Sequence, residues 1–282
     1  MPDKSPLVTM LRLLGKSLPG DYLKTAFYLN CIARPRKALH TSLHAFYRMD
    51  HIYEVLQEFK NNYQGKFSLL EFGTSDGYIF IKMLYATKYL KMQDRVMVHG
   101  FDSFQGLPHP DPLDRNLVSN YDFMAGDYHG EYEELEEYCR QRYQNYRLHR
   151  GYFENTINEE FLSTLETHLP ILVWIDCDYY QSARTVMERL IPYLPNGCAI
   201  YFDDYDNINF GSRFTGEARL VFEINRGEFG DGIELVRDPK LSLDTLRIYR
   251  FVNCYSPPAF EPIAKGPRSL LKNPRKNGSP LP

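Results

Sequence analysis

Between about residues 66 and 254, short apolar runs alternate with longer helical segments, and this alternation constrains the fold more than any other feature. Strands that alternate with helices are typical of a parallel sheet covered on both faces. Two late apolar runs, joined by a short turn-rich link, predict an antiparallel pair at the sheet edge. The predicted strands are 67–72, 96–101, 146–149, 171–175, 198–202, 232–237 and 245–252, and the predicted helices are 78–90, 131–145 and 182–194.

Two appendages flank this α/β domain. The N-terminal segment has helical character, is mildly basic and has an apolar face, which predicts a lid or arm packed on the domain. Contact of its leucine stripe with a membrane surface is an alternative, and its aromatic residues leave homo-oligomerisation open. The C-terminal segment is basic and rich in proline and glycine, which predicts a mobile tail. The predicted divisions are 1–64, 65–254 and 255–282, with the apolar face at Phe46, Ile52, Val55, Leu56 and Phe59 and the stripe at Leu7, Leu11 and Leu14.

Charge and cysteine usage exclude several classes of protein. The net charge of −3 over 282 residues lacks the basic excess of a nucleic-acid binder. Five scattered cysteines without a CxxC pair argue against a disulfide framework or a structural zinc site. We find no signal-peptide pattern and no apolar run near the roughly 20 residues that span a bilayer. A reducing, cytoplasmic location is therefore expected.

The residues that follow each predicted strand are the candidates for chemistry, because ligands of open parallel sheets bind beyond the carboxyl ends of the strands. After the first strand, Gly73 and Gly77 allow a tight turn and a close approach of the backbone to a ligand. After the second strand, Asp102 occupies the position at which an acid commonly binds ribose hydroxyls. A turn glycine and a capping aspartate are the plainer interpretations of these residues.

Four aspartates follow the fourth and fifth predicted strands: Asp176, Asp178, Asp203 and Asp204. The ends of neighbouring strands lie about 5 Å apart. At 4 Å and an effective dielectric constant near 20, each like-charge pair costs about 4 kcal/mol. Such a cluster must protonate, spread apart or bind a cation, and oxygen ligands favour Mg²⁺, Ca²⁺ or Mn²⁺. Capping of two helix starts is the alternative role.

Five motifs, in order over about 70–254, resemble those of the macrocin O-methyltransferase family, whose members methylate sugar hydroxyls in natural-product biosynthesis. The family's first loop carries E-x-G, its later motifs DSFEGLP, GxFxxTL and D-x-D-L-Y-x-S-T, and its last motif DDY. In this chain they stand as EFGTSDG (71–77), DSFQGLP (102–108), GYFENTI (151–157), DCDYYQSA (176–183) and DDYD (203–206).

The resemblance implies a class I, Rossmann-like methyltransferase fold with a seven-stranded, mostly parallel sheet. It implies S-adenosylmethionine and Mg²⁺ as cofactors and a small-molecule acceptor, namely a sugar or natural-product hydroxyl. It places cofactor binding at Glu71, Gly73, Ser75, Gly77, Asp102, Ser103 and Phe153, the metal at Asp176, Asp203 and Asp204, and Asp178 beside the metal. Asp178 or Asp176 is the candidate base that accepts the hydroxyl proton.

Three positions depart from the family's motifs. Asp76 stands where the family tends to have glycine or a small residue, and it would repel the methionine carboxylate unless it faces the ammonium group or solvent. Tyr179 replaces a leucine and Ala183 a threonine beside the expected metal. Three other functions stay open: a catalytically silent binding or scaffold module, methylation of a catechol-like or polyketide hydroxyl, and a membrane or polymer tether at the chain ends.

Overall fold

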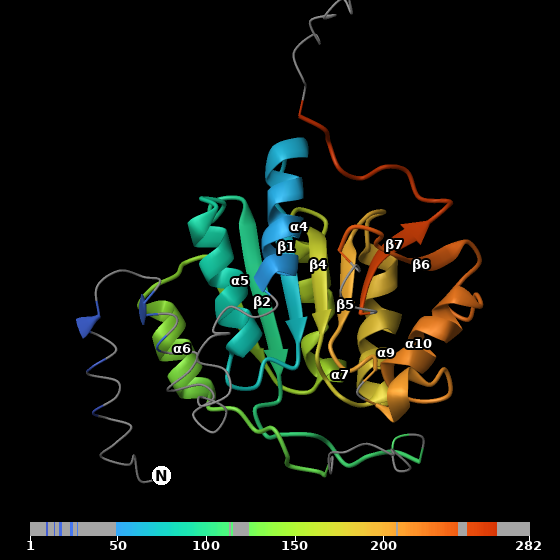
Figure 1. Cartoon of the computed structure of the whole chain (residues 1–282), viewed down its shortest axis with the longest axis horizontal. Coiled ribbons are helices and arrows are strands. Elements are labelled where there is room, and N and C mark those ends of the chain that lie inside the picture. Colours follow the sequence, from blue (N-terminus) through green and yellow to red (C-terminus); the bar gives the residue numbers. More distant parts are fainter. Residues whose placement is uncertain are drawn as a thin grey trace, which may run out of the picture.

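In the computed structural model, a seven-stranded sheet forms the centre of the part of the chain that the structure describes (Figure 1). That part comprises residues 49–112, 114, 124–206, 208–241 and 247–263 and a few single positions between 10 and 27. The strand order is β3-β2-β1-β4-β5-β7-β6, and only the pairings of β7 are antiparallel. The strands are β1 (Phe67–Phe72), β2 (Val96–Asp102), β3 (Tyr146–Arg150), β4 (Leu169–Ile175), β5 (Ala199–Phe202), β6 (Ile233–Arg237) and β7 (Ile248–Asn253). The predicted sheet, including its antiparallel edge pair, is confirmed.

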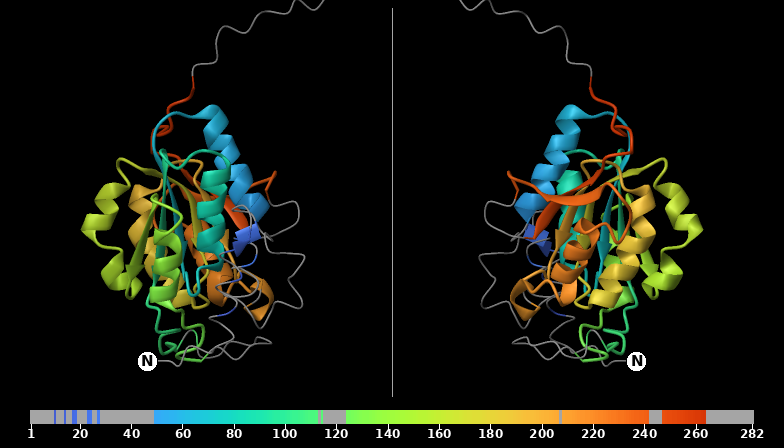
Figure 2. Two further views of the ribbon diagram at one scale, coloured as in Figure 1. Left: turned by 90° about the vertical axis from the view of Figure 1, so that its left-hand side faces the viewer. Right: turned by 90° about the vertical axis from the view of Figure 1, so that its right-hand side faces the viewer.

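Helices cover both faces of the sheet, which Figure 2 shows edge-on. One face packs against α4, α5 and α6, and the other against α7, α8, α9 and α10. The helices are α4 (Met49–Asn62), α5 (Tyr78–Tyr89), α6 (Tyr132–Arg140), α7 (Phe153–Thr156), α8 (Glu159–Thr164), α9 (Tyr180–Leu190) and α10 (Gly216–Asn225), with 3₁₀ turns at Ile191–Tyr193 and Asn209–Gly211. The structure is therefore a three-layer α/β sandwich.

Alternate residues of each central strand face opposite layers, so that the sheet separates two apolar cores. Trp174 and Tyr201 face the α4–α6 side and stack with their ring centres 3.8 Å apart. Val173 and Ile200, their neighbours in sequence, face the α9–α10 side. Because full burial of such a side chain contributes about 1.5–3 kcal/mol, these unbroken apolar runs hold the sheet between its helices.

The helix after β4 differs from the predicted 182–194 segment at both of its ends. It begins at Tyr180, and after Leu190 it continues only as the 3₁₀ turn Ile191–Tyr193. Pro192 lies in that turn and has no N–H with which to continue the α-helical hydrogen bonds. Helices α7, α8 and α10 were not predicted.

Helix α4 makes up most of what the structure describes of the predicted N-terminal arm, and it packs directly on the sheet. Ile52, Val55 and Phe59 are at most 1% exposed and belong to the core. Arg250 of β7 binds the Glu58 carboxylate of α4 at 2.6 Å and so links the helix to the sheet edge. Phe46 and the leucine stripe lie outside the positions whose side chains are described, apart from Leu14, which is exposed. No helix within the described residues is long and apolar enough to cross a membrane.

The chain stays attached to the domain beyond the predicted start of its tail at residue 255. The N–H of Ile263 donates to the carbonyl of Asn62, and the N–H of Gln64 donates to the carbonyl of Glu261. Phe260 packs edge-on against Phe59 with ring centres 4.6 Å apart. This aromatic contact offsets the flexibility that the proline and glycine content indicated, and the rest of the predicted tail lies outside the described residues.

At the centre of the sheet, β1 pairs with β4. From β1 the following strands, β2 and β3, are added toward one edge, and from β4 the later strands are added toward the other edge. Gly73, just after β1, has a φ of +95°, and a Cβ atom placed on it would lie 1.7 Å from the Asp176 carbonyl oxygen. Only glycine allows this approach. The loop after β1 and the loop after β4 therefore meet backbone to backbone at the switch point, the place where ligands of such sheets bind.

Replacing Gly73 by alanine should lower the free energy of unfolding by about 2–5 kcal/mol, because the positive φ and the steric clash with Asp176 both act against the side chain. Gly65→Ala is the matched control, since Gly65 also has a positive φ, +100°, but an added Cβ would meet nothing within 4 Å. Urea unfolding followed by the fluorescence of Trp174, the chain's one tryptophan, measures both variants. Equal losses in the two variants would contradict the importance of the contact.

Candidate active site

The loop between β1 and α5 turns sharply and presents main-chain N–H groups toward the end of β2. Gly77 is the N-cap of α5 and has a φ of +80°. The N–H of Ser75 donates to Oδ2 of Asp102 at 2.8 Å, and the Ser75 hydroxyl donates to the carbonyl of Tyr128. The predicted glycines and Ser75 therefore do shape one turn beside Asp102.

Asp102 joins the loops that follow β1 and β2. While Oδ2 accepts the Ser75 N–H, Oδ1 accepts the N–H of Phe104 at 2.5 Å. Burial raises the pKa of Asp102 although these two N–H groups act to lower it. The carboxylate is thus held at the strand end with its orientation fixed, and each oxygen keeps a second lone pair for a ligand hydroxyl.

The other predicted cofactor residues have differing surroundings. Glu71 is 1% exposed at the end of β1. Ser103 stabilises the next turn, because its hydroxyl donates to the Gly106 carbonyl and accepts the N–H of Gln105. Phe153 of α7 packs edge-on against Phe72, with ring centres 5.6 Å apart. These contacts are structural, and contact of all three with a cofactor stays a prediction.

The predicted acidic cluster follows two strands that are neighbours in the sheet. Ile175 of β4 pairs with Phe202 of β5, and the N–H of Asp203 donates to the Ile175 carbonyl at 2.9 Å. Asp176 and Asp203 therefore leave adjacent strand ends. Asp178 has a φ of +60°, a left-handed conformation that costs an aspartate about 1 kcal/mol or more.

The carboxyl groups of this cluster interact strongly. Burial raises the pKa of Asp178 well above its usual range, and the charges of Asp204, Asp176 and Asp203 add to the effect in that order. A hydrogen bond between the carboxyl groups of Asp178 and Asp204 contributes as well. Crowding of the carboxyl groups therefore disfavours their ionised forms, as expected for like charges brought together.

The donor set fits a hard divalent cation, although the ligands are not gathered around one point. Within the part of the chain that the structure describes, no group of three or more His, Cys, Asp or Glu side chains is arranged to hold a metal ion. The cluster nonetheless offers only oxygen atoms, and a cation would favour the ionised forms that burial opposes. The structure thus brings Asp176, Asp178, Asp203 and Asp204 to the ends of neighbouring strands without arranging them around a metal, and the metal stays a prediction.

Cys177, which lies between two of these aspartates, packs into the core and does not join the cluster. It is 6% exposed and belongs to the core on the α9–α10 side. Burial raises the pKa of its thiol well above the usual range. Cys177 is therefore a packing residue.

Two acidic residues next to the cluster escaped prediction. Glu217 lies in the first turn of α10, is fully buried, and accepts the N–H of Asp204 through Oε2 at 2.9 Å. Asp114 belongs to the long loop after β2 and accepts the N–H groups of Tyr180 and Gln181 at 2.9 and 3.2 Å. Asp114 therefore caps α9 from 66 residues upstream. The only signal in the sequence was the length of its loop.

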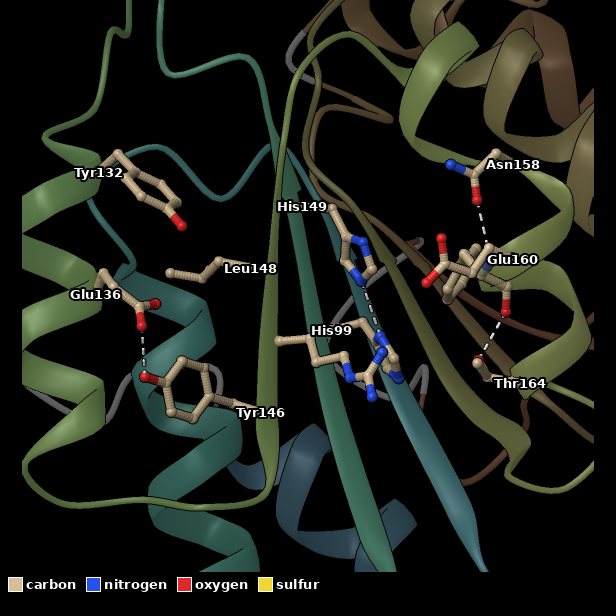
Figure 3. A pocket seen from close by; sticks show the side chains of 11 residues that line it. His99, Tyr132, Glu136, Tyr146, Leu148, His149, Asn158, Glu160 and Thr164 are labelled. Carbon is tan, nitrogen blue, oxygen red and sulfur yellow. Dashed lines mark hydrogen bonds between the residues drawn. The ribbon is translucent and has the colours of Figure 1, made fainter.

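A cavity of about 520 Å³ lies away from the strand ends, along the edge strand β3 between α6 and α8 (Figure 3). On one side of β3 the Tyr146 hydroxyl binds the Glu136 carboxylate, and on the other side His149 Nε2 lies 3.0 Å from His99 Nδ1. Burial lowers the pKa of His99 to about 3 and that of His149 to about 4, with Arg147 nearby acting in the same direction. The two histidines are thus neutral at pH 7 and share one hydrogen bond.

The histidine pair should make the protein less stable as the pH falls from about 6.5 toward 4. Both folded pKa values lie below the ordinary value of 6.5, so the unfolded chain binds more protons in this window. At pH 5 this costs about 2 kcal/mol for one histidine. His99→Gln should remove about that much of the difference in unfolding free energy between pH 8 and pH 5. The exposed His129→Gln is the control, and an unchanged difference in His99→Gln would contradict the assignment.

We compared the sequence and the fold of the chain with those of known proteins. Two solved structures share the fold: the calicheamicin methyltransferase CalS11, at 19% identity and a TM-score of 0.56 over 91% of this chain and 94% of that one, and the O-methyltransferase NovP, at 20% identity and a TM-score of 0.51 over 73% and 79%. No curated protein matches the sequence significantly. The sequence model of the macrocin-O-methyltransferase (TylF) family matches residues 32–226, which is more than half of the chain. The chain therefore belongs to the macrocin-O-methyltransferase family and is an S-adenosylmethionine-dependent O-methyltransferase.

Proposed function

We propose that this enzyme transfers a methyl group from S-adenosylmethionine to a hydroxyl group of a sugar or a sugar-bearing natural product, with the help of Mg²⁺. The observation that carries the proposal is the meeting of the Gly73 loop with the aspartate cluster. A loop suited to the cofactor and a group of carboxylates suited to an acceptor hydroxyl share one backbone contact at the switch point.

On the cofactor side, the geometry around Asp102 supports binding of the ribose. Its carboxylate lies at the end of β2, next to the turn that Gly73 and Gly77 allow. An acid at this position in Rossmann-like folds accepts hydrogen bonds from ribose hydroxyls. The resemblance adds Glu71, Ser75, Ser103 and Phe153 to this side of the site.

On the acceptor side, a sugar hydroxyl is a poor nucleophile because its pKa is high, and the carboxylates would help to activate it. In-line placement of the hydroxyl against the sulfonium methyl group supplies roughly 7–11 kcal/mol of the barrier. Mg²⁺ held by Asp176, Asp203 and Asp204 would orient two adjacent hydroxyls and lower their pKa. Asp178, whose pKa is raised by burial and by its acidic neighbours, is the candidate general base for the hydroxyl proton, with Asp176 as the second candidate.

The surroundings of the site are part of the proposal. We place the enzyme in the cytoplasm, which the free, buried Cys139, Cys177 and Cys198 support. The segment 1–64 would act as a lid or arm on the methyltransferase domain, and its aromatic residues would serve in a homo-oligomer. Acceptor and cofactor are small molecules, and the chain's slight negative charge supports neither nucleic acid nor an anionic membrane as a partner.

Asp176→Asn should reduce Mg²⁺-dependent methyl transfer by about a hundredfold or more, because it removes a proposed metal ligand and base candidate. The binding constant for S-adenosylmethionine should stay close to that of the wild type. Transfer of a radiolabelled methyl group to a panel of glycosides with adjacent hydroxyls measures the first quantity, and calorimetry measures the second. The exposed Asp231→Asn is the matched control.

Near-normal turnover of Asp176→Asn without added metal would contradict the proposed mechanism. A wild-type chain that does not bind S-adenosylmethionine would favour a silent scaffold. Methyl transfer to catechols but not to glycosides would replace the proposed acceptor class.

A further inference from the structure

Glu217 is a fully buried carboxylate at the acidic end of the sheet. It lies in the first turn of α10, and its side chain is 0% exposed. Its Oε2 accepts the main-chain N–H of Asp204 at 2.9 Å, across 13 residues of sequence. This hydrogen bond fixes the start of the loop after β5, where Asp203 and Asp204 leave the sheet.

The second carboxylate oxygen of Glu217 is not used by the protein. Among the described residues, Oε1 has no hydrogen-bond partner although it is fully buried. Leaving a buried polar group unsatisfied costs about 1–3 kcal/mol, and more for a charged group. A neutral acceptor of the same length would receive the Asp204 N–H without burying an acidic group, so this hydrogen bond alone does not account for a glutamate here.

The charges that act on Glu217 are also unfavourable for an isolated anion. Burial is the largest effect that disfavours its ionised form and raises its pKa. The negative charges of Asp204, Asp203 and Asp176 act in the same direction. A buried anion among anions is costly unless a cation joins them. The same three aspartates are the proposed metal ligands, so the cation that would relieve them would also relieve Glu217.

We propose that Glu217 is a fourth acidic residue of the divalent-cation site, which positions Asp204 through its main-chain N–H and adds its own negative charge to the binding of the cation. This inference rests on the proposed function. Residues that orient metal ligands typically change metal affinity by 10–100-fold when they are replaced. Glu217 acts on the reaction through Asp204 and the cation and is therefore a positioning residue.

Glu217→Gln tests the proposal, because glutamine keeps the shape and the acceptor for the Asp204 N–H but removes the charge. Titration of the full-length protein with Mn²⁺, followed by electron paramagnetic resonance, should show affinity reduced about tenfold or more. The affinity for S-adenosylmethionine should not change. Glu228→Gln, an exposed residue just beyond the other end of α10, removes the same charge and should bind Mn²⁺ like the wild type.

Thermal unfolding gives a second readout that does not depend on activity. In metal-free buffer Glu217→Gln should be at least as stable as the wild type, because glutamine is neutral and needs neither a proton nor a cation at this buried position. Saturating Mn²⁺ should raise the melting temperature of the wild type more than that of the variant. A variant that is less stable or unfolded without metal would overturn the proposal, since the charge would then be compensated by the protein itself.

Equal Mn²⁺ affinity of Glu217→Gln and the wild type would overturn this inference and leave the proposed methyl transfer intact. No Mn²⁺ binding by the wild type would overturn the metal site of the proposed function together with the role of Glu217. The two failures are distinguished by the wild-type titration alone.

Discussion

The backbone contact between Gly73 and Asp176 joins the two halves of the site. Here β1 and β4 lie side by side, and the loop that leaves β1 touches the loop that leaves β4. The loop after β1 begins α5 and donates the Ser75 N–H to Asp102. The loop after β4 carries Asp176 and Asp178. A methyl donor on the first and a hydroxyl acceptor on the second would lie at the same edge of the sheet. Any change that separates the strands there affects both halves.

The acidic end of the sheet is costly to build and is of little use to the fold alone. Burial and mutual repulsion raise the pKa of Asp178 and Glu217 well above their usual ranges, and Asp178 also takes a left-handed backbone conformation. Folding alone would favour apolar or singly paired side chains at these positions. The concentration of charge and strain at a topological switch point is typical of a site whose cost is offset by ligand binding. The same feature explains why a cation is expected here.

Much of this arrangement could be predicted from the sequence, because the signals are local. An apolar run followed by Asp176 or Asp203 marks a buried strand and its end, and adjacency of β4 and β5 brings the two together. The roles of Glu217 and Asp114 could not be predicted, because each depends on a contact with a distant residue and α10 itself was not predicted. The tail was likewise judged by composition, whereas Phe260 attaches its first residues to α4.

A crystal structure with S-adenosylhomocysteine and Mn²⁺ tests the central claim most directly, because the anomalous signal locates the ion independently of its surroundings. We expect the ion among Asp176, Asp203 and Asp204, and the ribose of the nucleoside on Asp102. The sulfur of the product should point across the Gly73–Asp176 contact toward the ion. A nucleoside bound elsewhere, or an ion that avoids these carboxylates at saturating concentration, would contradict the account.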